Sequence, residues 1–194
     1  MSFMAQAAVA RVTREQYLSR EVEAETRSEY RSGRVYAMSG GSLNHGTLVH
    51  VLGSALLIAT EGTPCVSFGS ELKLRVEAAD AYFYLDAMIV CGEVEVESET
   101  NGIITNPSVV FEVLSPGTQG YDKNGKFLDY QTVPSLREVI FLRSDRKVAQ
   151  RYERQDDGSW RYTAYVGDVK LPIGVADVEI DLVRLYARLR LESE

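Results

Sequence analysis

The chain alternates between short apolar runs of strand length and segments with helical periodicity. The clearest helical segment is 43–60, where Leu48, Leu52 and Leu56 recur every four residues and so lie on one face. Ser42 stands directly before this segment and can serve as its N-cap. The pattern therefore predicts one long helix with an apolar face.

Shorter signals surround this helix. Thr13 and Gln16 have the spacing of a capping box and predict a short helix reaching Glu25. The segment 28–38 predicts a hairpin with Ser32-Gly33 at its turn. Other apolar, β-branched or aromatic runs predict strands; they are 65–68, 72–76, 82–91, 109–114, 138–142, 147–154 and 160–165. The acidic segment 93–100 is either a solvated loop or an edge strand.

Two further helices are predicted over 122–132 and 180–191. The resulting order is helix, hairpin, helix, several strands, helix, several strands, helix, which is typical of a mixed α/β (α+β) fold around one central sheet. No repeat or linker divides the chain. We therefore expect a single domain over 1–194, with 1–12 as a flexible N-terminus.

Composition narrows the class of protein. The net charge of −7 argues against a broad nucleic-acid-binding surface, because phosphate contacts supply most of the affinity, although local basic patches remain possible. Cys65 and Cys91 lie in apolar runs, and we expect buried free thiols in a reducing compartment rather than a zinc site. No run reaches the ~18 apolar residues of a membrane span. We expect a soluble, cytoplasmic protein.

Two acids interrupt apolar strands and indicate chemistry. Glu112 lies inside the run Val109–Ser115, and Asp86 follows the run 82–85. A carboxylate buried in a strand needs a cation, a hydrogen-bond network or a metal. If the two strands are neighbours, ~4.8 Å apart, both acids can share a divalent ion, and Lys126 on the next predicted helix can assist. This layout is expected of a metal-dependent phosphodiesterase.

The same residues allow a purely structural interpretation. Glu112 can be ion-paired with Lys73, Arg75 or Lys126 without any catalytic role. Lys126 can pair with Asp122 one turn earlier, at ~0.3–0.5 kcal/mol. A hydrolase that uses Ser115 or Ser42 with His45 lacks a supporting spacing. The residues alone leave the metal site and the structural ion pair open.

Several motifs, in order, resemble the Uma-two (Uma2) family of bacterial restriction-endonuclease-like proteins. They run from Thr13 to Tyr186 and comprise Glu29-Tyr30 with Gly33-Arg34-Val35, Met38-Ser39-Gly40-Gly41-Ser42 with His45, Tyr84-Leu85-Asp86, Glu112-Val113-Leu114-Ser115-Pro116 with Thr118, and Tyr121-Asp122-Lys123 with Lys126 and Tyr130. Two departures stand out. Leu85 replaces the motif's proline, and Lys123 replaces its usual arginine, which keeps the charge but loses the planar fork.

The resemblance implies a restriction-endonuclease-like core of the PD-(D/E)xK type: a central mixed sheet flanked by helices, with additional hairpins. Asp86 and Glu112 would bind Mg²⁺ or Mn²⁺. Glu29 matches a family acid that would complete the metal site. Lys126 would be the catalytic lysine, displaced from its usual place two residues after the acid. Other positions would contact substrate or support these groups; they are His45, Lys73, Asp122 and Tyr130.

The expected function is hydrolysis of DNA phosphodiester bonds by an endonuclease, and paired cleavage of two strands suggests a homodimer by analogy. The alternative is a catalytically inactive protein of the same fold that binds nucleic acid or a protein partner. The charge around Asp86 discriminates between them. A basic rim from Lys73, Arg75, Lys123 and Lys126 favours the nuclease, and an acidic rim favours the alternative.

Overall fold

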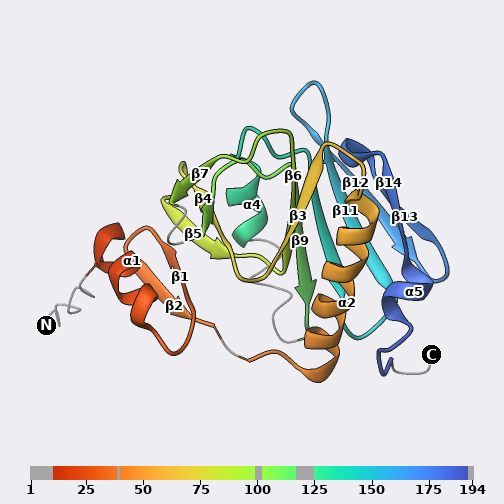
Figure 1. Ribbon diagram of the computed structural model, residues 1–194, viewed down its shortest axis with the longest axis horizontal. Coiled ribbons are helices and arrows are strands. Elements are labelled where there is room, and N and C mark those ends of the chain that lie inside the picture. Colours follow the sequence, from red (N-terminus) through yellow and green to blue (C-terminus); the bar gives the residue numbers. More distant parts are fainter. Residues whose placement is uncertain (1–10, 39, 99–101, 117–124, 192–194) are drawn as a thin grey trace, which may run out of the picture.

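Within the described residues, the strands form two six-stranded sheets and one two-stranded ribbon, with helices packed on them (Figure 1). The computed structural model describes residues 11–38, 40–98, 102–116 and 125–191. The helices are α1 Arg14–Glu23, α2 Leu43–Thr60, α4 Phe127–Tyr130 and α5 Leu182–Tyr186, with a 3₁₀ turn at Gly174–Ala176. The strands are β1 Ser28–Arg31, β2 Arg34–Ala37, β3 Cys65–Gly69, β4 Lys73–Val76, β5 Ala81–Tyr84, β6 Ala87–Cys91, β7 Val96–Ser98, β8 Ile103–Ile104, β9 Val109–Leu114, β10 Glu138–Arg143, β11 Val148–Arg154, β12 Trp160–Val166, β13 Lys170–Ile173 and β14 Val178–Asp181.

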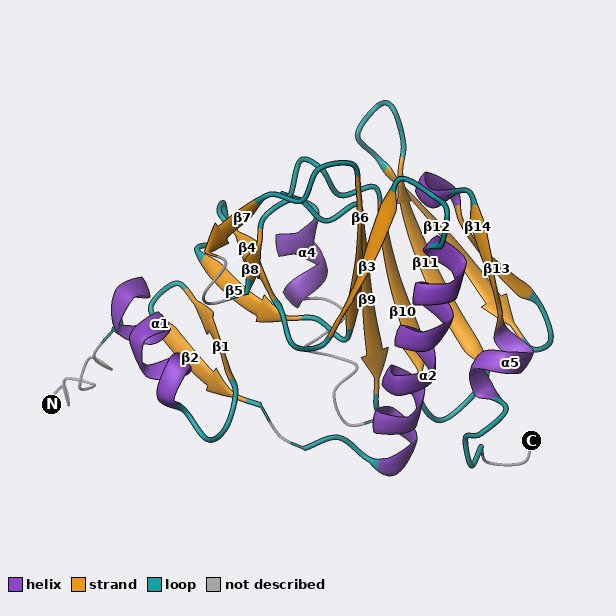
Figure 2. Ribbon diagram, viewed as in Figure 1, coloured by secondary structure: helices purple, strands orange, loops and turns teal. Residues whose placement is uncertain are grey.

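The central sheet has the order β12-β11-β10-β9-β6-β3. Strands β9 and β10 are parallel neighbours, and α4 lies in the connection between them, so this unit is a βαβ crossover. Figure 2 shows α2 in front of the central sheet, and α2 contacts β3 and β9. The crossover therefore brings α4 back next to the strand that carries Glu112.

Strand β9 separates two apolar cores by simple alternation. Val109, Phe111 and Val113 join the core under α2, whereas Val110 and Leu114 join the core shared with α4 and the second sheet. All six β9 residues are buried. Glu112 has the parity of Val110 and Leu114, so its carboxylate lies on the α4 side of the sheet.

The second sheet has the order β2-β1-β5-β4-β8-β7. The predicted strand 82–91 is two strands, because the chain leaves the second sheet after β5 and enters the central sheet at β6. Leu85 and Asp86 form the break. The expectation of one continuous strand and one sheet is therefore wrong in detail, and the break itself puts Asp86 between the two sheets.

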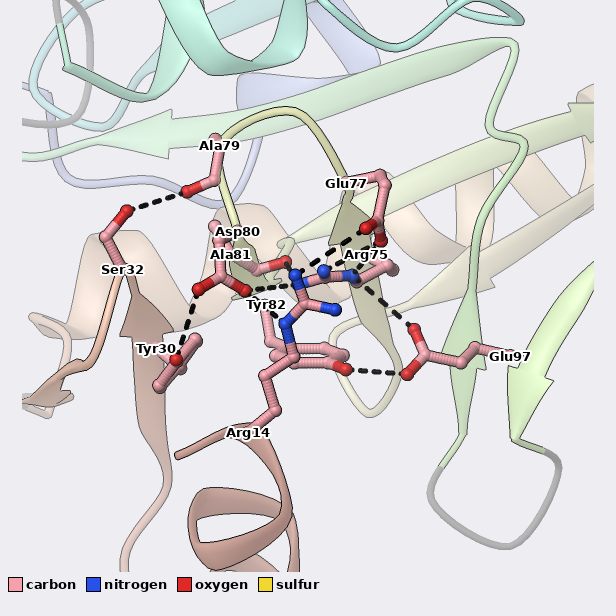
Figure 3. Close-up of polar contacts among 10 residues, drawn as sticks. All are labelled: Arg14, Tyr30, Ser32, Arg75, Glu77, Ala79, Asp80, Ala81, Tyr82 and Glu97. Carbon is pink, nitrogen blue, oxygen red and sulfur yellow. Dashed lines mark hydrogen bonds and ion pairs between the residues drawn. The ribbon is translucent and has the colours of Figure 1, made fainter. Parts of the chain in front are cut away.

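Helix α1 and the β1–β2 hairpin form an N-terminal arm that docks on β5 through a cluster of aromatic and charged side chains. The rings of Tyr17 and Tyr30 stack at 5.3 Å, and Tyr17 stacks on Tyr82 of β5 at 5.7 Å. In Figure 3, Asp80 accepts hydrogen bonds from Arg14, Arg75 and Tyr30. This arm carries Glu29, so its docking fixes one wall of the site described below.

The local predictions for the first half of the chain are confirmed. Helix α1 has its Thr13–Gln16 capping box, and α2 begins after Ser42, whose side chain accepts the His45 N–H. The hairpin turns at Ser32-Gly33, where both residues have positive φ. The acidic segment contains the edge strand β7. Of the predicted helix 122–132, the described part contains α4, with a π-helical turn at 125–126 directly before it.

Lys73 and Arg75 of β4 are buried, and the rings of Tyr84 and Tyr82 lie against their charged groups at 4.8 and 4.7 Å. One expectation about helix content is wrong. The predicted helix 180–191 starts later, since Ile180 belongs to the β13–β14 ribbon. That ribbon is held by burial of its apolar residues in the α2 core, a tertiary contact that local periodicity does not reveal.

The free-thiol expectation for the cysteines is also wrong. Cys65 and Cys91 form a disulfide, because β3 and β6 pair antiparallel with these two residues directly opposite each other. Their spacing along the sequence does not reveal that register. The argument for a reducing compartment loses this support.

Helix α2 has the length and mean hydropathy, 1.3, that a membrane-crossing helix also has. Leu48, Leu52 and Leu56 are fully buried against the sheet, whereas Leu57 and Ile58 are exposed. The buried face makes α2 a helix of the protein core in this structure.

We expect reduction of the disulfide to destabilise the fold. It joins positions 26 residues apart, and losing a loop closure of this size costs about 3 kcal/mol. Thiol titration of the unreduced, denatured protein should detect no free thiol, and a reductant should lower the urea midpoint. The double variant Cys65→Ser, Cys91→Ser should not respond to reductant. Two titratable thiols in freshly purified protein would contradict the assignment.

The Asp80 cluster should give the arm a defined pH dependence. Burial alone would raise the pKa of Asp80, but hydrogen bonds and charges from Arg14, Arg75 and Tyr30 hold it below its ordinary value of 3.8. A depressed pKa contributes stability above the unfolded value, and this is lost as the pH falls through the folded value. Asp80→Asn should therefore cost about 1 kcal/mol at pH 5–8 and progressively less below about pH 4. The control Asp156→Asn, at an exposed turn, should change neither the free energy of unfolding nor its pH dependence, both measured by thermal unfolding. A stability loss for Asp80→Asn that stays constant down to pH 2 would contradict this role.

Candidate active site

One cavity of about 490 Å³ contains side chains from five separate segments. Asp86 comes from the break between β5 and β6, Glu112 from β9 and Lys126 from the residue before α4. Glu29 comes from β1, and His45 from the first turn of α2. The structure thus brings together the predicted catalytic residues and His45, which lie up to 97 positions apart in the chain.

Lys126 lies buried between two carboxylates. Its Nζ is 2.7 Å from Glu29 Oε1 and 3.4 Å from Glu112 Oε1, and all three side chains are less than a tenth exposed. The Tyr84 N–H donates to the same Glu29 oxygen at 3.2 Å, and the Tyr130 hydroxyl donates to Glu112 Oε1. A buried ion pair that loses one partner typically costs 3–5 kcal/mol, so these groups hold one another in place.

Asp86 is held from two sides. Its Oδ2 accepts the Val113 N–H at 2.6 Å, which ties it to the residue after Glu112. Its Oδ1 lies 3.6 Å from His45 Nε2. The His45 ring packs so closely on Gly41 that a Cβ there would lie 2.6 Å from Nδ1, which explains why only glycine suits this position. Strand β9 and the start of α2 therefore fix the Asp86 carboxylate together.

The electrostatics of the cavity disfavour ionised Glu112. Burial raises its pKa to about 8; Lys126 opposes the shift, the charges of Asp86 and Glu29 add to it, and the Tyr130 hydrogen bond opposes it. Three acids, Glu29, Asp86 and Glu112, face one ammonium group in this cavity. The site has excess negative charge that a bound cation would neutralise.

The donor set suits a hard divalent cation. Mg²⁺ commonly takes one or two protein carboxylates and fills its other positions with waters and phosphate oxygens, and Asp86 and Glu112 supply two carboxylates to the same cavity. Within the described residues, no group of three or more His, Cys, Asp or Glu side chains forms a ready cage. The residues therefore fit an ion that keeps part of its hydration, and do not fit a closed structural metal site.

Other predicted site residues have different positions. Tyr130 contacts Glu112, as described, but Lys73 lies against the Tyr84 ring and does not line the cavity. Arg75 faces the Asp80 cluster instead, so neither Lys73 nor Arg75 forms the basic rim. Asp122 and Lys123 lie outside the described residues. Ser42 Oγ serves as the cap of α2 and accepts the His45 N–H.

Among the cavity residues that sequence reasoning did not name as site residues are Tyr36 and Met38. Tyr36 is the register partner of Glu29 in the hairpin, so the two side chains lie on one face. The predicted turn at Ser32-Gly33 already implied that pairing. The turn position sets the hairpin register, and that register would have placed Tyr36 opposite Glu29.

With fold and site established, comparison with known proteins gives the family. Residues 14–184 match the Uma2 family, described as "Putative restriction endonuclease". Two similar proteins come from Synechocystis sp.: "Uncharacterized protein sll1609", 31% identical over 81% of this chain and 89% of its own length, and "Uncharacterized protein slr1290", 32% identical over 82% and 83%. A solved structure described as "a putative nuclease belonging to DUF820 from Anabaena variabilis" has a TM-score of 0.67 at 16% identity, over 84% of this chain and 92% of that one.

The fold is that of a restriction-endonuclease-like protein, as the sequence motifs predicted. The chain belongs to the Uma2 family.

The raised pKa of Glu112 should appear in the stability of the metal-free protein. An acid with a folded pKa near 8 and an ordinary value of 4.5 binds more protons when folded, so stability falls as the pH rises between these values. With a chelator present, the wild type should lose about 1 kcal/mol per pH unit over part of this range relative to Glu112→Gln, measured by urea unfolding. The exposed-site control Glu179→Gln should follow the wild type, and parallel curves for wild type and Glu112→Gln would contradict the assignment.

Proposed function

We propose that this protein is a nuclease that hydrolyses phosphodiester bonds of DNA with the help of Mg²⁺ or Mn²⁺. The observation that carries the proposal is the convergence of Asp86, Glu112 and Lys126 in one cavity. Membership of the Uma2 family supports a nuclease, and the donor set supports the ion.

Each residue has a distinct task in this proposal. Asp86 and Glu112 would hold the ion, which polarises the phosphate and lowers the pKa of an attacking water. Lys126 offers an ammonium group to the negative charge that develops on the phosphate. Glu29 holds the Lys126 ammonium group in position through their 2.7 Å contact. Tyr130 orients Glu112 through its hydrogen bond, and His45 orients Asp86.

The charge of the cavity sets the order of binding. Three acids face a single ammonium group in this cavity, so a phosphodiester would meet net negative charge unless a further cation is bound. DNA binding at this site should therefore require the divalent ion, and the acidic net charge of the whole chain strengthens that requirement.

The alternative is a catalytically inactive protein of the nuclease fold that binds nucleic acid or another protein. One observation favours it: Lys126 is engaged by two acids, and Lys73 and Arg75 contribute nothing to a basic rim. In this case the ion pair would only stabilise the fold. Metal binding separates the two functions.

A homodimer belongs to the first proposal, because cleavage of both strands of a duplex uses two active sites. The analogy, and not a contact in this structure, supports it.

Loss of either acid should abolish metal binding. We expect Mn²⁺ titrated by calorimetry, with and without inorganic phosphate, to bind the wild type but neither Asp86→Ala nor Glu112→Ala, because each variant removes one of two carboxylate ligands. Asp86→Ala should also abolish metal-dependent DNA cleavage while retaining a cooperative thermal transition. Asp168→Asn, an exposed acid paired with Lys147, is the matched control and should behave as wild type. A folded wild type that binds no Mn²⁺ in either buffer would leave the inactive binding protein as the better description.

A further inference from the structure

Strand β2 borders the cavity and is exposed along its whole length. It is the edge strand of its sheet, next to β1. In the hairpin register Glu29 faces Tyr36 and Arg31 faces Arg34. Facing residues of a hairpin lie on the same side, so Arg34 and Tyr36 share the face from which Glu29 contacts Lys126.

Arg34 and Tyr36 follow one another along that face, and Met38 comes directly after β2. Tyr36 and Met38 line the cavity and are 36% and 42% exposed, and Arg34 lies one step further out. Among the described residues Arg34 is exposed and forms no ion pair, unlike its neighbour Arg31, which is 2.9 Å from Asp129. We call Arg34, Tyr36 and Met38 the β2 stripe.

The chemistry of the β2 stripe fits a nucleotide. An aromatic ring and a thioether offer flat or polarisable apolar surface for a base, and a guanidinium group binds phosphate. Alternate residues of a strand are about 6.7 Å apart, so the stripe offers one base contact and one phosphate contact in succession. Arg34, the cationic end of the stripe, lies outside the acidic cavity. There it can attract a phosphate of the same strand that lies beyond the metal site.

The stripe also distinguishes between forms of nucleic acid. In a duplex the faces of a base are covered by its neighbours, so a side chain can stack only on a base that has left the helix. A second chain added to the open edge of β2 would use its backbone groups and would not need an aromatic ring beside the carboxylates.

Resting on the proposed nuclease function, we propose that the β2 stripe binds an unpaired DNA strand next to the scissile phosphate. Tyr36, supported by Met38, stacks on the base adjacent to the phosphate held at Asp86 and Glu112. Arg34 binds the following phosphate. The substrate is then DNA with a single-stranded segment at the cleavage point.

The test compares single-stranded and duplex DNA. Fluorescence polarisation would measure binding of a short labelled oligonucleotide, alone or annealed to its complement, with Ca²⁺ as an oxygen-binding ion. Tyr36→Ala should weaken single-strand binding about ten-fold and change duplex binding less than about two-fold. Tyr36→Phe keeps the ring and should match the wild type. Val35→Ala, on the opposite face of β2 at 43% exposure, is the matched control and should also match it.

Arg34→Gln should weaken binding to single strands and reduce the slope of affinity against salt by about one phosphate contact. The proposal is overturned if Tyr36→Ala equals Val35→Ala on single strands, if it weakens duplex binding equally, or if the wild type does not bind single strands. If the protein does not cleave DNA but Tyr36→Ala still weakens single-strand binding, the nuclease activity is rejected and the binding site is supported. If the protein cleaves DNA but Tyr36→Ala does not weaken single-strand binding, the nuclease activity is supported and the binding site is rejected.

Discussion

Lys126 lies buried between Glu29 and Glu112, and this contact joins three segments that the chain could otherwise place independently. It connects the N-terminal hairpin, the βαβ crossover and the central sheet. Without the ammonium group, two carboxylates would be buried near each other with no cation to pair with, which is energetically costly. The fold of this region therefore depends on the same charges that the proposed chemistry uses.

The N-terminal arm contributes more than Glu29. Its aromatic stack on Tyr82 and its charged cluster at Asp80 fix the hairpin at β5, and the hairpin then presents Glu29 and the β2 stripe to the cavity. Figure 3 draws the contacts around Asp80, and none of the residues in it lines the cavity. Variants that weaken docking of the arm would disturb the site although the substituted residue lies outside it. The cavity therefore forms only when the arm is docked.

The sequence predicted local features well where one residue pair decides the outcome. The Thr13 capping box, the Ser32-Gly33 turn and the Ser42 cap are such cases. Prediction from the sequence failed where contacts between residues far apart in the chain determine the structure. Nothing local shows that Cys65 faces Cys91, or that Ile180 belongs to a ribbon over the core. For the site, the buried acids and Lys126 were predicted, but the position of Lys73 against Tyr84 depends on sheet pairing and was not.

The cost of the buried charges bears on why they are there. Glu112 is the only polar residue among the six buried positions of β9, and an apolar side chain would suit that position at least as well. Replacing a buried ion pair with well-packed apolar groups is often neutral or stabilising, so stability alone accounts poorly for Glu29, Glu112 and Lys126. The proposed function would account for the charges, because in it the cavity attracts a cation and then a phosphate. Burial raises the pKa of Glu112 to about 8 even with Lys126 beside it, and a divalent ion bound at this carboxylate would favour its ionised form at neutral pH.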